Sequence, residues 1–411
     1  MFRGGPTHTG AYASSTTPAL GTVAWKFKAG GKFISSPAVH DGVVFAGNSD
    51  RHIYAVAAGD GSLKWKFATK GPVNSSPAVS GGIVIAGSVD GLIYGIDEAT
   101  GAQKWTFATA GERRFTAPGI HGGMPRTQMM ADPFDMFLSS PTVDAGTVYV
   151  GSGDQHVYAL NAATGALKWK FKTGDVVHAS PAVANGLVYV GSWDSNFYAI
   201  DAASGTLRWK FATGRDTVIY NQVGIASSAA VVGANVYFGC RDGFLYVLDA
   251  RTGALKWKHD NNHGWVIGSP AVHDGVVYFA TSDGTRFKAL DAVSGAVKFN
   301  ITNKAISFSS PAVVNNAVLF GTSDGWLHSI DRITGNVLAE FQTDGSKANA
   351  AKYTGADGRM NSGLMYPDFT LEGMFIGLDR VFTLGSVISS PVVANGVVYF
   401  GSTDGHLYAL R

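Results

Sequence analysis

The sequence predicts an all-β fold, an eight-bladed β-propeller with four-stranded antiparallel blades. A pattern of about forty residues recurs along the 411-residue chain, and each copy holds four short strand-like segments separated by turn residues. A period of this length with four strands is typical of a propeller blade. The last copy also lacks its fourth segment, which appears instead near the N-terminus. Since one blade cannot bury both of its faces, the copies must stack in a ring.

A Ser-Pro pair opens seven of the copies and sets their register, and Ser228-Ala229 opens the remaining one. Four of the seven intervals between these openings are 40 or 41 residues long. The three longer intervals predict insertions near 108–138, 212–227 and 342–388 in a single domain, 1–411. The longest one shows no remnant of a further blade between Gln342 and Phe382. The Ser-Pro copies open at Pro37, Pro77, Pro141, Pro181, Pro270, Pro311 and Pro391.

The elements of one copy follow from its residue types. After the innermost strand, Val188 and Val190 alternate with an aromatic residue, which is typical of a β-strand. Asp-Gly pairs such as Asp90-Gly91 then supply the positive φ of a tight hairpin turn. A third strand follows, and a Thr-Gly or Ser-Gly turn leads to the fourth strand. A tryptophan four residues after that glycine predicts a packing anchor between blades, as at Trp65, Trp105, Trp169, Trp209 and Trp257.

The missing fourth strand of the last copy predicts how the ring closes. The chain stops at Arg411, after the third strand of that copy. Gly21 is followed four residues later by Trp25-Lys26-Phe27, the spacing of every other fourth strand. We therefore expect the N-terminal strand to complete the C-terminal blade, which covers edges that an open array would leave unpaired.

Composition excludes several classes of function. A formal net charge of +2 predicts no strong attraction to nucleic acid or membranes. The sequence shows no apolar run of membrane-spanning length and no signal peptide. The single cysteine, Cys240, excludes an internal disulfide and leaves the compartment open. We read the eight turn aspartates, from Asp50 to Asp404, as turn residues rather than metal ligands. We expect no metal site, no nucleophilic role for Cys240 and a monomer.

The run from Ala159 to Trp169 resembles the tryptophan-docking motif of quinoprotein alcohol dehydrogenases, Ala-x-Asp/Asn-x-x-Thr/Ser-Gly-x-x-x-Trp. The run from Ala199 to Trp209 matches it as well. The resemblance covers nearly the whole chain and is specific for the eight-bladed PQQ-like propeller superfamily, which contains PQQ-dependent dehydrogenases and BamB-type outer-membrane assembly lipoproteins. It implies a periplasmic or extracellular location, with a cytoplasmic one left open.

The resemblance also raises the question of a cofactor. The dehydrogenases of the superfamily imply a PQQ clamp that often includes a disulfide between adjacent cysteines, an aromatic floor, and a calcium ion held by carboxylate and amide groups. This chain has no Cys-Cys pair, and no Glu, Asn and Asp set matches the calcium ligands. We therefore expect no cofactor, neither PQQ nor calcium.

Candidate binding residues gather in the insertions. All three insertions lie in connections from a fourth strand to the next innermost strand, which should share one face with the Asp turns. Long loops on one rim of a rigid scaffold commonly carry binding groups. Their arginines, histidines and aromatic residues suit a polar or anionic, saccharide-like ligand. The predicted ligand-binding residues are Arg113, Arg114, His121, His156, His178, Arg215, Tyr220, His263, Arg359 and Tyr366.

Three functions stay open at this point, and the sequence assigns no catalytic residue. The insertions favour a ligand-binding propeller, with lyase or hydrolase activity as an option. The first alternative is a non-catalytic scaffold for protein partners, similar to BamB. The second is a PQQ-dependent oxidoreductase. For single residues there are simpler interpretations: His178 as a buried hydrogen-bonded residue, and His156 as ordinary variation in a turn.

Overall fold

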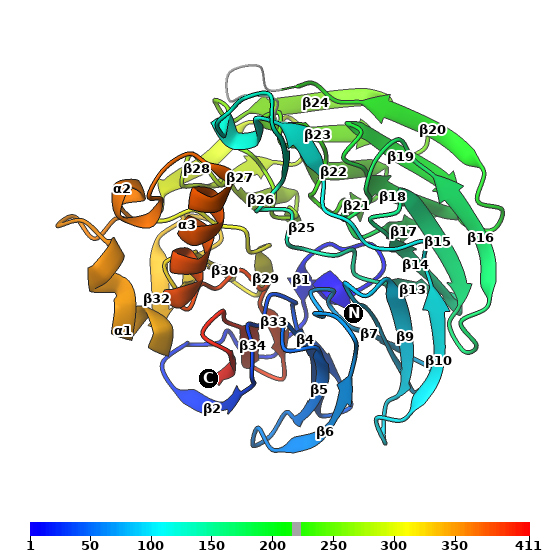
Figure 1. Ribbon diagram of the computed structural model, residues 1–411, viewed down its shortest axis with the longest axis horizontal. Helices are drawn as coiled ribbons and strands as arrows, with labels where there is room; N and C mark the ends of the chain where they lie inside the picture. The colour runs from blue at the N-terminus through cyan, green and yellow to red at the C-terminus, as the bar shows by residue number, and fades with distance from the viewer. Residues whose placement is uncertain (216–222) are drawn as a thin grey trace.

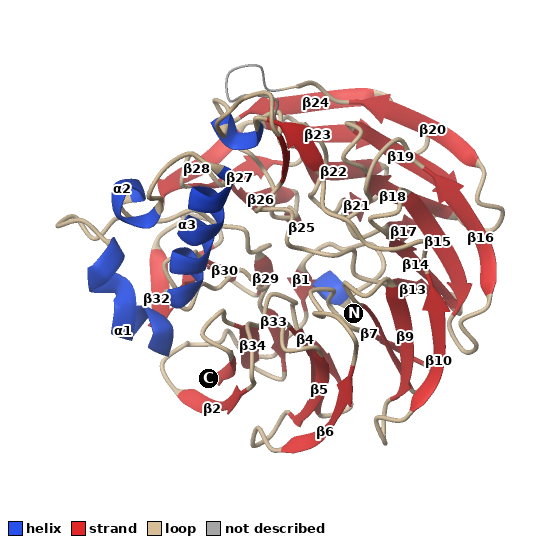
Figure 2. Cartoon of the chain, viewed as in Figure 1, coloured by secondary structure: helices blue, strands red, loops and turns tan. Residues whose placement is uncertain are grey.

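The computed structural model describes residues 1–215 and 223–411, and it places eight four-stranded antiparallel sheets in a ring (Figure 1). This confirms the predicted propeller and its number of blades. Each blade runs outward from a short innermost strand to the long fourth strand at the periphery. Strands form nearly all of the ring, and three helices gather at one side of it (Figure 2).

The first four blades follow the chain in order. Blade 1 contains β3 (Ala38–His40), β4 (Val43–Asn48), β5 (His52–Ala57) and β6 (Leu63–Ala68). Blade 2 contains β7 (Ala78–Ser80), β8 (Ile83–Gly87), β9 (Leu92–Asp97) and β10 (Gln103–Ala108). Blade 3 contains β13 (Thr142–Asp144), β14 (Thr147–Gly151), β15 (His156–Asn161) and β16 (Leu167–Lys172). Blade 4 contains β17 (Ala182–Ala184), β18 (Leu187–Gly191), β19 (Asn196–Asp201) and β20 (Leu207–Ala212).

The remaining blades complete the circle. Blade 5 contains β21 (Ala230–Val232), β22 (Asn235–Gly239), β23 (Phe244–Asp249) and β24 (Leu255–Asp260). Blade 6 contains β25 (Ala271–His273), β26 (Val276–Ala280), β27 (Arg286–Asp291) and β28 (Val297–Thr302). Blade 7 contains β29 (Ala312–Val314), β30 (Ala317–Gly321), β31 (Trp326–Asp331) and β32 (Val337–Gln342). Blade 8 contains β33 (Val392–Ala394), β34 (Val397–Gly401), β35 (His406–Leu410) and the N-terminal β2 (Val23–Lys28).

The ring closes as predicted. β2 pairs antiparallel with β35, with Trp25 opposite Ala409 and Lys26 opposite Tyr408. The residues before β2 were not predicted to have a role, and they run along the inside of the ring. Backbone carbonyls of residues 6–10 accept hydrogen bonds of 2.7–2.9 Å from the innermost strands of blades 4 to 7. β1 (Ala11–Tyr12) then adds to blade 7 as a parallel strand, so the N-terminal segment ties four further blades together.

Two buried side chains fix this segment. Arg3 donates to the carbonyl oxygens of His8 and Pro270, and the His8 imidazole lies 2.9 Å from the Thr142 hydroxyl. Burial, together with the neighbouring Arg3 charge, lowers the pKa of His8 to about 3. The N-terminus therefore lies near the middle of the ring (Figure 1).

A closed circle of serines links the blades around the axis. The backbone N–H of the serine before each blade-opening residue donates to the serine Oγ of the next blade, at 2.8–3.1 Å, through all eight interfaces. The proline that follows each serine in seven blades fixes the backbone direction at this point. The serines are Ser36, Ser76, Ser140, Ser180, Ser228, Ser269, Ser310 and Ser390.

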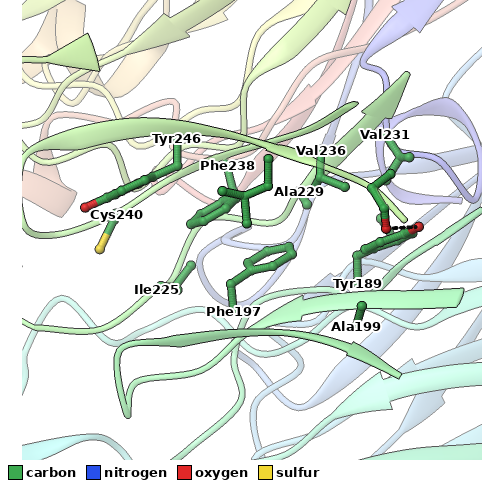
Figure 3. Packing of buried hydrophobic residues seen from close by; sticks show 13 residues of the cluster. Tyr189, Phe197, Ala199, Ile225, Ala229, Val231, Val236, Phe238, Cys240 and Tyr246 are labelled. Atoms are coloured by element: carbon green, nitrogen blue, oxygen red, sulfur yellow. Dashed lines mark hydrogen bonds between the residues drawn. The ribbon is translucent and has the colours of Figure 1, made fainter. Parts of the chain in front are cut away.

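Interfaces between blades are apolar and repeat the same contacts. Between blades 4 and 5, Phe197 and Phe238 stack with their centroids 4.1 Å apart, and Cys240 lies in the same cluster (Figure 3). Burial raises the pKa of the Cys240 thiol, which suits a packing residue. At the periphery, the indole of Trp169 donates to the carbonyl oxygen of Ala202 in the next blade, at 2.9 Å. Trp25, Trp65, Trp105 and Trp209 make equivalent bonds.

The turn aspartates also join blades. In six blades the carboxylate accepts from a tyrosine hydroxyl four residues later, as in the pair of Asp194 and Tyr198. The same carboxylate accepts from a backbone N–H in the connection from the preceding blade, as from Gly174 to Asp194. These bonds place the Asp turns and the inter-blade connections on one face, which we call the insertion face.

The insertions carry secondary structure that the sequence was not predicted to form. The first holds a two-stranded sheet, β11 (Thr116–Pro118) and β12 (Met129–Ala131), and the short turn η2 (Ile120–Gly122). The third holds α1 (Asp344–Tyr353), α2 (Ser362–Met365) and α3 (Leu371–Thr383). A further short turn, η1 (Phe2–Gly4), lies at the N-terminus. Within the described residues, none of these helices has the length and apolar character of a membrane span.

Candidate functional site

The first and third insertions meet on the insertion face. The backbone N–H of Met124 donates to the carbonyl oxygen of Phe369 at 3.0 Å, and the Arg114 guanidinium lies 5.5 Å from the ring centre of Phe375 on α3. The first insertion also packs on blade 4, where Phe115 stacks on Trp193 at 4.7 Å. Loops from distant parts of the chain therefore build one surface.

A buried ion pair lies under this surface. Arg241, at the turn of blade 5, forms a salt bridge with Asp132 of the first insertion, and the two side chains are 1% and 0% exposed. The guanidinium lies 4.6 Å from the ring centres of both Trp193 and Trp265. His121 lies 2.8 Å from the other Asp132 oxygen. Burial opposes ionisation, but the Arg241 and His121 charges outweigh it and hold the pKa of Asp132 well below its usual range.

A cavity of about 190 Å³ opens beside this ion pair, and we call it the rim cavity. It receives side chains from both joined insertions and from the turn and connections around blade 6. Its walls are largely aromatic, and its polar groups include two carboxylates. The lining residues are His121, Phe134, Trp265, Ser282, Asp283, Ile306, Phe308, Tyr366, Asp368, Phe369 and Met374.

Asp283 differs from the turn aspartates that join blades. The turn of blade 6 is one residue longer, since Thr281 N–H bonds to Arg286 O where Ser88 N–H bonds to Leu92 O in blade 2. Asp283 lies in this turn, as predicted, and it also lines the rim cavity, where it is exposed to solvent. The protein packed around its carboxyl group nevertheless raises its pKa. Burial, followed by the Asp283 charge, raises the pKa of Tyr366 to about 12.

His178 anchors the first insertion from below. Its Nδ1 lies 2.6 Å from an Asp135 oxygen, and its Nε2 lies 3.4 Å from a Glu112 oxygen. Burial alone would lower its pKa, but the charges and hydrogen bonds of Asp135 and Glu112 outweigh burial and raise it to about 10. His178 is thus an imidazolium that ties blade 4 to the first insertion, and it lines the axial channel.

We expect His178 to stay protonated through the neutral range. A raised folded-state pKa means that its contribution to stability is fully present below about pH 6.5, the unfolded value, and is lost as the pH rises through about 10. The melting-temperature difference between the wild type and His178→Gln should therefore shrink between pH 7 and pH 10.5. NMR titration of labelled histidines checks the same point directly. A His178 signal that titrates near pH 6.5 would contradict this assignment.

The axial channel is narrow and covered at both ends. Its cavity is about 50 Å³, and Phe2 of the N-terminal segment is among its lining residues. On the insertion face, Phe382 and Leu378 of α3 and Met136 of the first insertion pack over Ile34 and Phe308. The insertions therefore close the axis and leave the rim cavity to one side of it.

The sequence comparison agrees with this architecture. The profile of the family described as "Outer membrane protein assembly factor BamB" matches residues 10–123, 126–263 and 224–360. The chain belongs to this BamB family. A search of curated proteins found no significant match.

Solved structures share the fold at low sequence identity. BamB from Moraxella catarrhalis is 16% identical, with a TM-score of 0.67, over 95% of this chain and 97% of that chain. A europium-containing methanol dehydrogenase is also 16% identical, with a TM-score of 0.71, over 98% and 96% of the two chains. A quinohemoprotein alcohol dehydrogenase from Comamonas testosteroni is 15% identical, with a TM-score of 0.71, over 98% and 79%. At these identities the likeness shows the fold alone.

The dehydrogenase likeness makes the fit of PQQ and calcium a relevant question. Within the described residues, no group of three or more His, Cys, Asp and Glu side chains is arranged to hold a metal ion. Two aromatic residues of the site, Trp193 and Trp265, already enclose the Arg241 guanidinium. These residues do not fit PQQ with calcium. That this BamB-family chain binds neither stays a prediction.

The structure brings only some of the predicted site residues together in the rim cavity. His121 and Tyr366 share the rim cavity, His178 lies beneath the first insertion, and Arg113 forms an ion pair with Asp175 at 2.7 Å. Arg215 is exposed and lines a second hollow with Phe115 and Trp193.

Three further predicted residues, His156, His263 and Arg359, line neither hollow. His156 bonds within its own turn to Asp154, and the exposed His263 lies in contact distance of the Gly243 turn. Arg359 is exposed, and its guanidinium lies 3.7 Å from Asp357 of its own loop. Tyr220 lies outside the described residues.

Sequence reasoning missed Arg241 and Asp283. A signal for each is present in the repeat. Arg241 stands directly before the turn aspartate, where most blades carry a small residue or valine, and Trp193 is the other large residue there. Asp283 belongs to the one turn with an additional residue, and Lys288 replaces the tyrosine that binds the aspartate in six other blades.

Proposed function

We propose that this BamB-family propeller binds a small polar ligand in the rim cavity. The observation that carries the proposal is that His121 and Tyr366, from two insertions far apart in the sequence, line one cavity with Trp265 and Phe308. Aromatic walls with a few convergent polar groups are typical of small-molecule sites. The volume of about 190 Å³ lies below the range of drug-sized sites, so the ligand should be small.

The geometry supports a saccharide-sized polar ligand better than an anionic one. Arg113 is engaged by Asp175, Arg241 by Asp132, and the polar lining of the cavity includes the carboxylates Asp283 and Asp368. Catalysis, as a lyase or hydrolase, would need a proton carrier in the cavity, and Asp283 with its raised pKa is the candidate. We also propose a periplasmic or extracellular location, because the family description refers to the outer membrane. A monomeric state is part of the same proposal.

Blocking the cavity should abolish ligand binding. Ile306 lines the cavity and is half-buried, so Ile306→Trp should fill the space without replacing a fully buried residue. We expect at least one member of a panel of neutral, cationic and anionic small molecules to bind the wild type in isothermal titration calorimetry. Its affinity should fall at least tenfold in Ile306→Trp.

Ile333→Trp is the matched control, because Ile333 is 64% exposed and lies in the outer turn between β31 and β32 of blade 7. PQQ with calcium is one arm of the panel, followed by cofactor absorbance. A ligand that binds Ile306→Trp as well as the wild type would contradict the proposed cavity. Stoichiometric PQQ binding would restore the oxidoreductase alternative.

A protein partner is the second candidate, and one observation favours it. Five large apolar side chains are exposed on the first and third insertions, namely Met124, Met129, Leu364, Phe369 and Ile376. Apolar residues gathered on one face can mark an interaction surface. The matched family is described by a role in outer membrane protein assembly, so its machinery is the partner to test. A photoreactive residue at position 376 should then cross-link to an assembly component in the native host, whereas one at position 333 should not.

A further inference from the structure

We propose that the ligand of the rim cavity is a small organic cation, an alkylamine or quaternary ammonium group. This inference rests on the proposed function and adds the charge of the ligand. Two features of the cavity carry it: carboxylates that form no ion pair with any described residue, and a wall of aromatic rings.

The carboxylates give the cavity its charge. Asp283 accepts from the Ser282 hydroxyl at 3.0 Å, and Asp368 accepts from the N–H and hydroxyl of Thr370. Among the described residues, no Lys, Arg or His lies within ion-pair distance of either carboxylate. The charges of His121 and Arg241 act on Asp283, but both groups pair with Asp132. A bound cation would complete the charge balance.

Asp283 is also released from the structural bond that its equivalents make. In six blades a tyrosine hydroxyl occupies the turn carboxylate, as Tyr246 does for Asp242. In blade 6 the corresponding residue is Lys288, whose ammonium group instead bonds to Asn261 at 2.9 Å. Asp283 therefore has a carboxylate oxygen available to a ligand within the cavity.

The aromatic walls suit the same ligand. Rings from both insertions and from the connections on either side of blade 6 line the space: Phe134, Trp265, Phe308, Tyr366 and Phe369. The rings are held in place by packing, with His121 against Phe134 at 4.9 Å and against Trp265 at 5.1 Å. Aromatic faces attract organic cations, and cages of aromatic rings commonly bind quaternary ammonium ligands. An anion would meet two like charges, whereas a neutral polyol would donate hydrogen bonds to the carboxylates without the attraction between full opposite charges.

Choline and its neutral isostere separate charge from shape. Calorimetry on the full chain should show choline binding at least tenfold more tightly than 3,3-dimethylbutan-1-ol, which has the same outline without the charge. Galacturonate should not bind, and methyl glucoside should bind more weakly than choline. Tryptophan fluorescence, compared between the wild type and Trp265→Phe because the chain has nine tryptophans, offers a second readout.

Variants test the two features separately. Asp283→Asn removes the charge and keeps the shape, and it should weaken choline binding at least tenfold. Asp357→Asn is the matched control on an exposed loop and should leave the affinity unchanged. Phe369 is 70% exposed, so Phe369→Leu should fold normally and weaken choline binding about two- to fivefold.

The outcomes distinguish this inference from the proposed function. The proposal of a cationic ligand is wrong if choline and its isostere bind equally, or if Asp283→Asn binds choline as tightly as the wild type. Tighter binding of methyl glucoside or galacturonate, abolished by Ile306→Trp, also overturns the cation but leaves the cavity as the binding site. If choline, its isostere, methyl glucoside and galacturonate all fail to bind, both proposals fail.

Discussion

Deletion of residues 1–27 is expected to unfold or aggregate the protein. The deletion removes most of β2, including Trp25 and Phe27, so β35 is left as an open sheet edge. It also removes the contact of Phe27 with Tyr54 of blade 1, at 5.3 Å between ring centres, and every hydrogen bond of the N-terminal segment to blades 4–7. A ring that has lost its closing strand has no other way to cover that edge.

Two further variants give the deletion its controls. Deletion of residues 1–12 keeps β2 but removes the segment inside the ring, and it should cause a smaller loss of melting temperature. Lys26→Ala changes an exposed side chain of the closing strand and should cost less than about 0.5 kcal/mol. Circular dichroism and size-exclusion chromatography measure all three. The closure would be unimportant if the protein without residues 1–27 stayed monomeric and melted within a few degrees of the full chain.

Arg241→Met is expected to be the most destabilising single substitution on the insertion face. It leaves Asp132 buried and charged, with His121 and the Phe134 N–H as its remaining partners, and it removes the cation from between Trp193 and Trp265. Breaking one side of a buried ion pair typically costs about 3–5 kcal/mol. Urea unfolding should show a loss of this size, and the first insertion should become sensitive to proteolysis.

The double variant Arg241→Met with Asp132→Leu tests the cause. Since no charge is left buried without a partner, it should recover most of the lost stability. Asp132 has a lowered folded-state pKa, so its contribution is present above about pH 3.9 and is lost as the pH falls through the folded value. The stability of the wild type relative to Arg241→Met should therefore decrease in acid. If Arg241→Met were as stable as the wild type at pH 7, the ion pair would not stabilise the insertion face.

The ring could be predicted from the sequence because every blade repeats the same pattern of strand and turn residues. Turn glycines and alternating strand residues predict the local structure of each blade, and the displaced strand at Trp25 predicts how the ring closes. No contact between distant residues had to be known. The insertions carry no such repetition. Asp132 and Arg241 are 109 residues apart, and only the closed ring and the folded first insertion bring them together. The sequence shows which residue types the insertions contain, but it does not show which of these residues pair.

The helices of the third insertion could be predicted in part from the sequence. Thr343, Asn361 and Thr370 cap them through side-chain oxygens. The pattern of Met374, Leu378 and Val381 places one apolar face of α3 toward the protein. Both signals can be read locally, yet where the helices lie on the ring follows only from tertiary contacts. That position is what closes the axis and forms one wall of the rim cavity.

Ring closure by the first strand has a consequence for synthesis. Lys28 and Asp404, which meet at the closing seam, are 376 residues apart, so at the usual rates of translation β2 waits about 20 to 75 seconds for its partner to leave the ribosome. An apolar strand that waits this long is an aggregation hazard. In β2 the aromatic residues Trp25 and Phe27 are each followed by a lysine, Lys26 and Lys28, which places positive charge on the waiting edge. The same alternation that turns lysines outward in the finished ring thus protects the nascent chain before the ring exists.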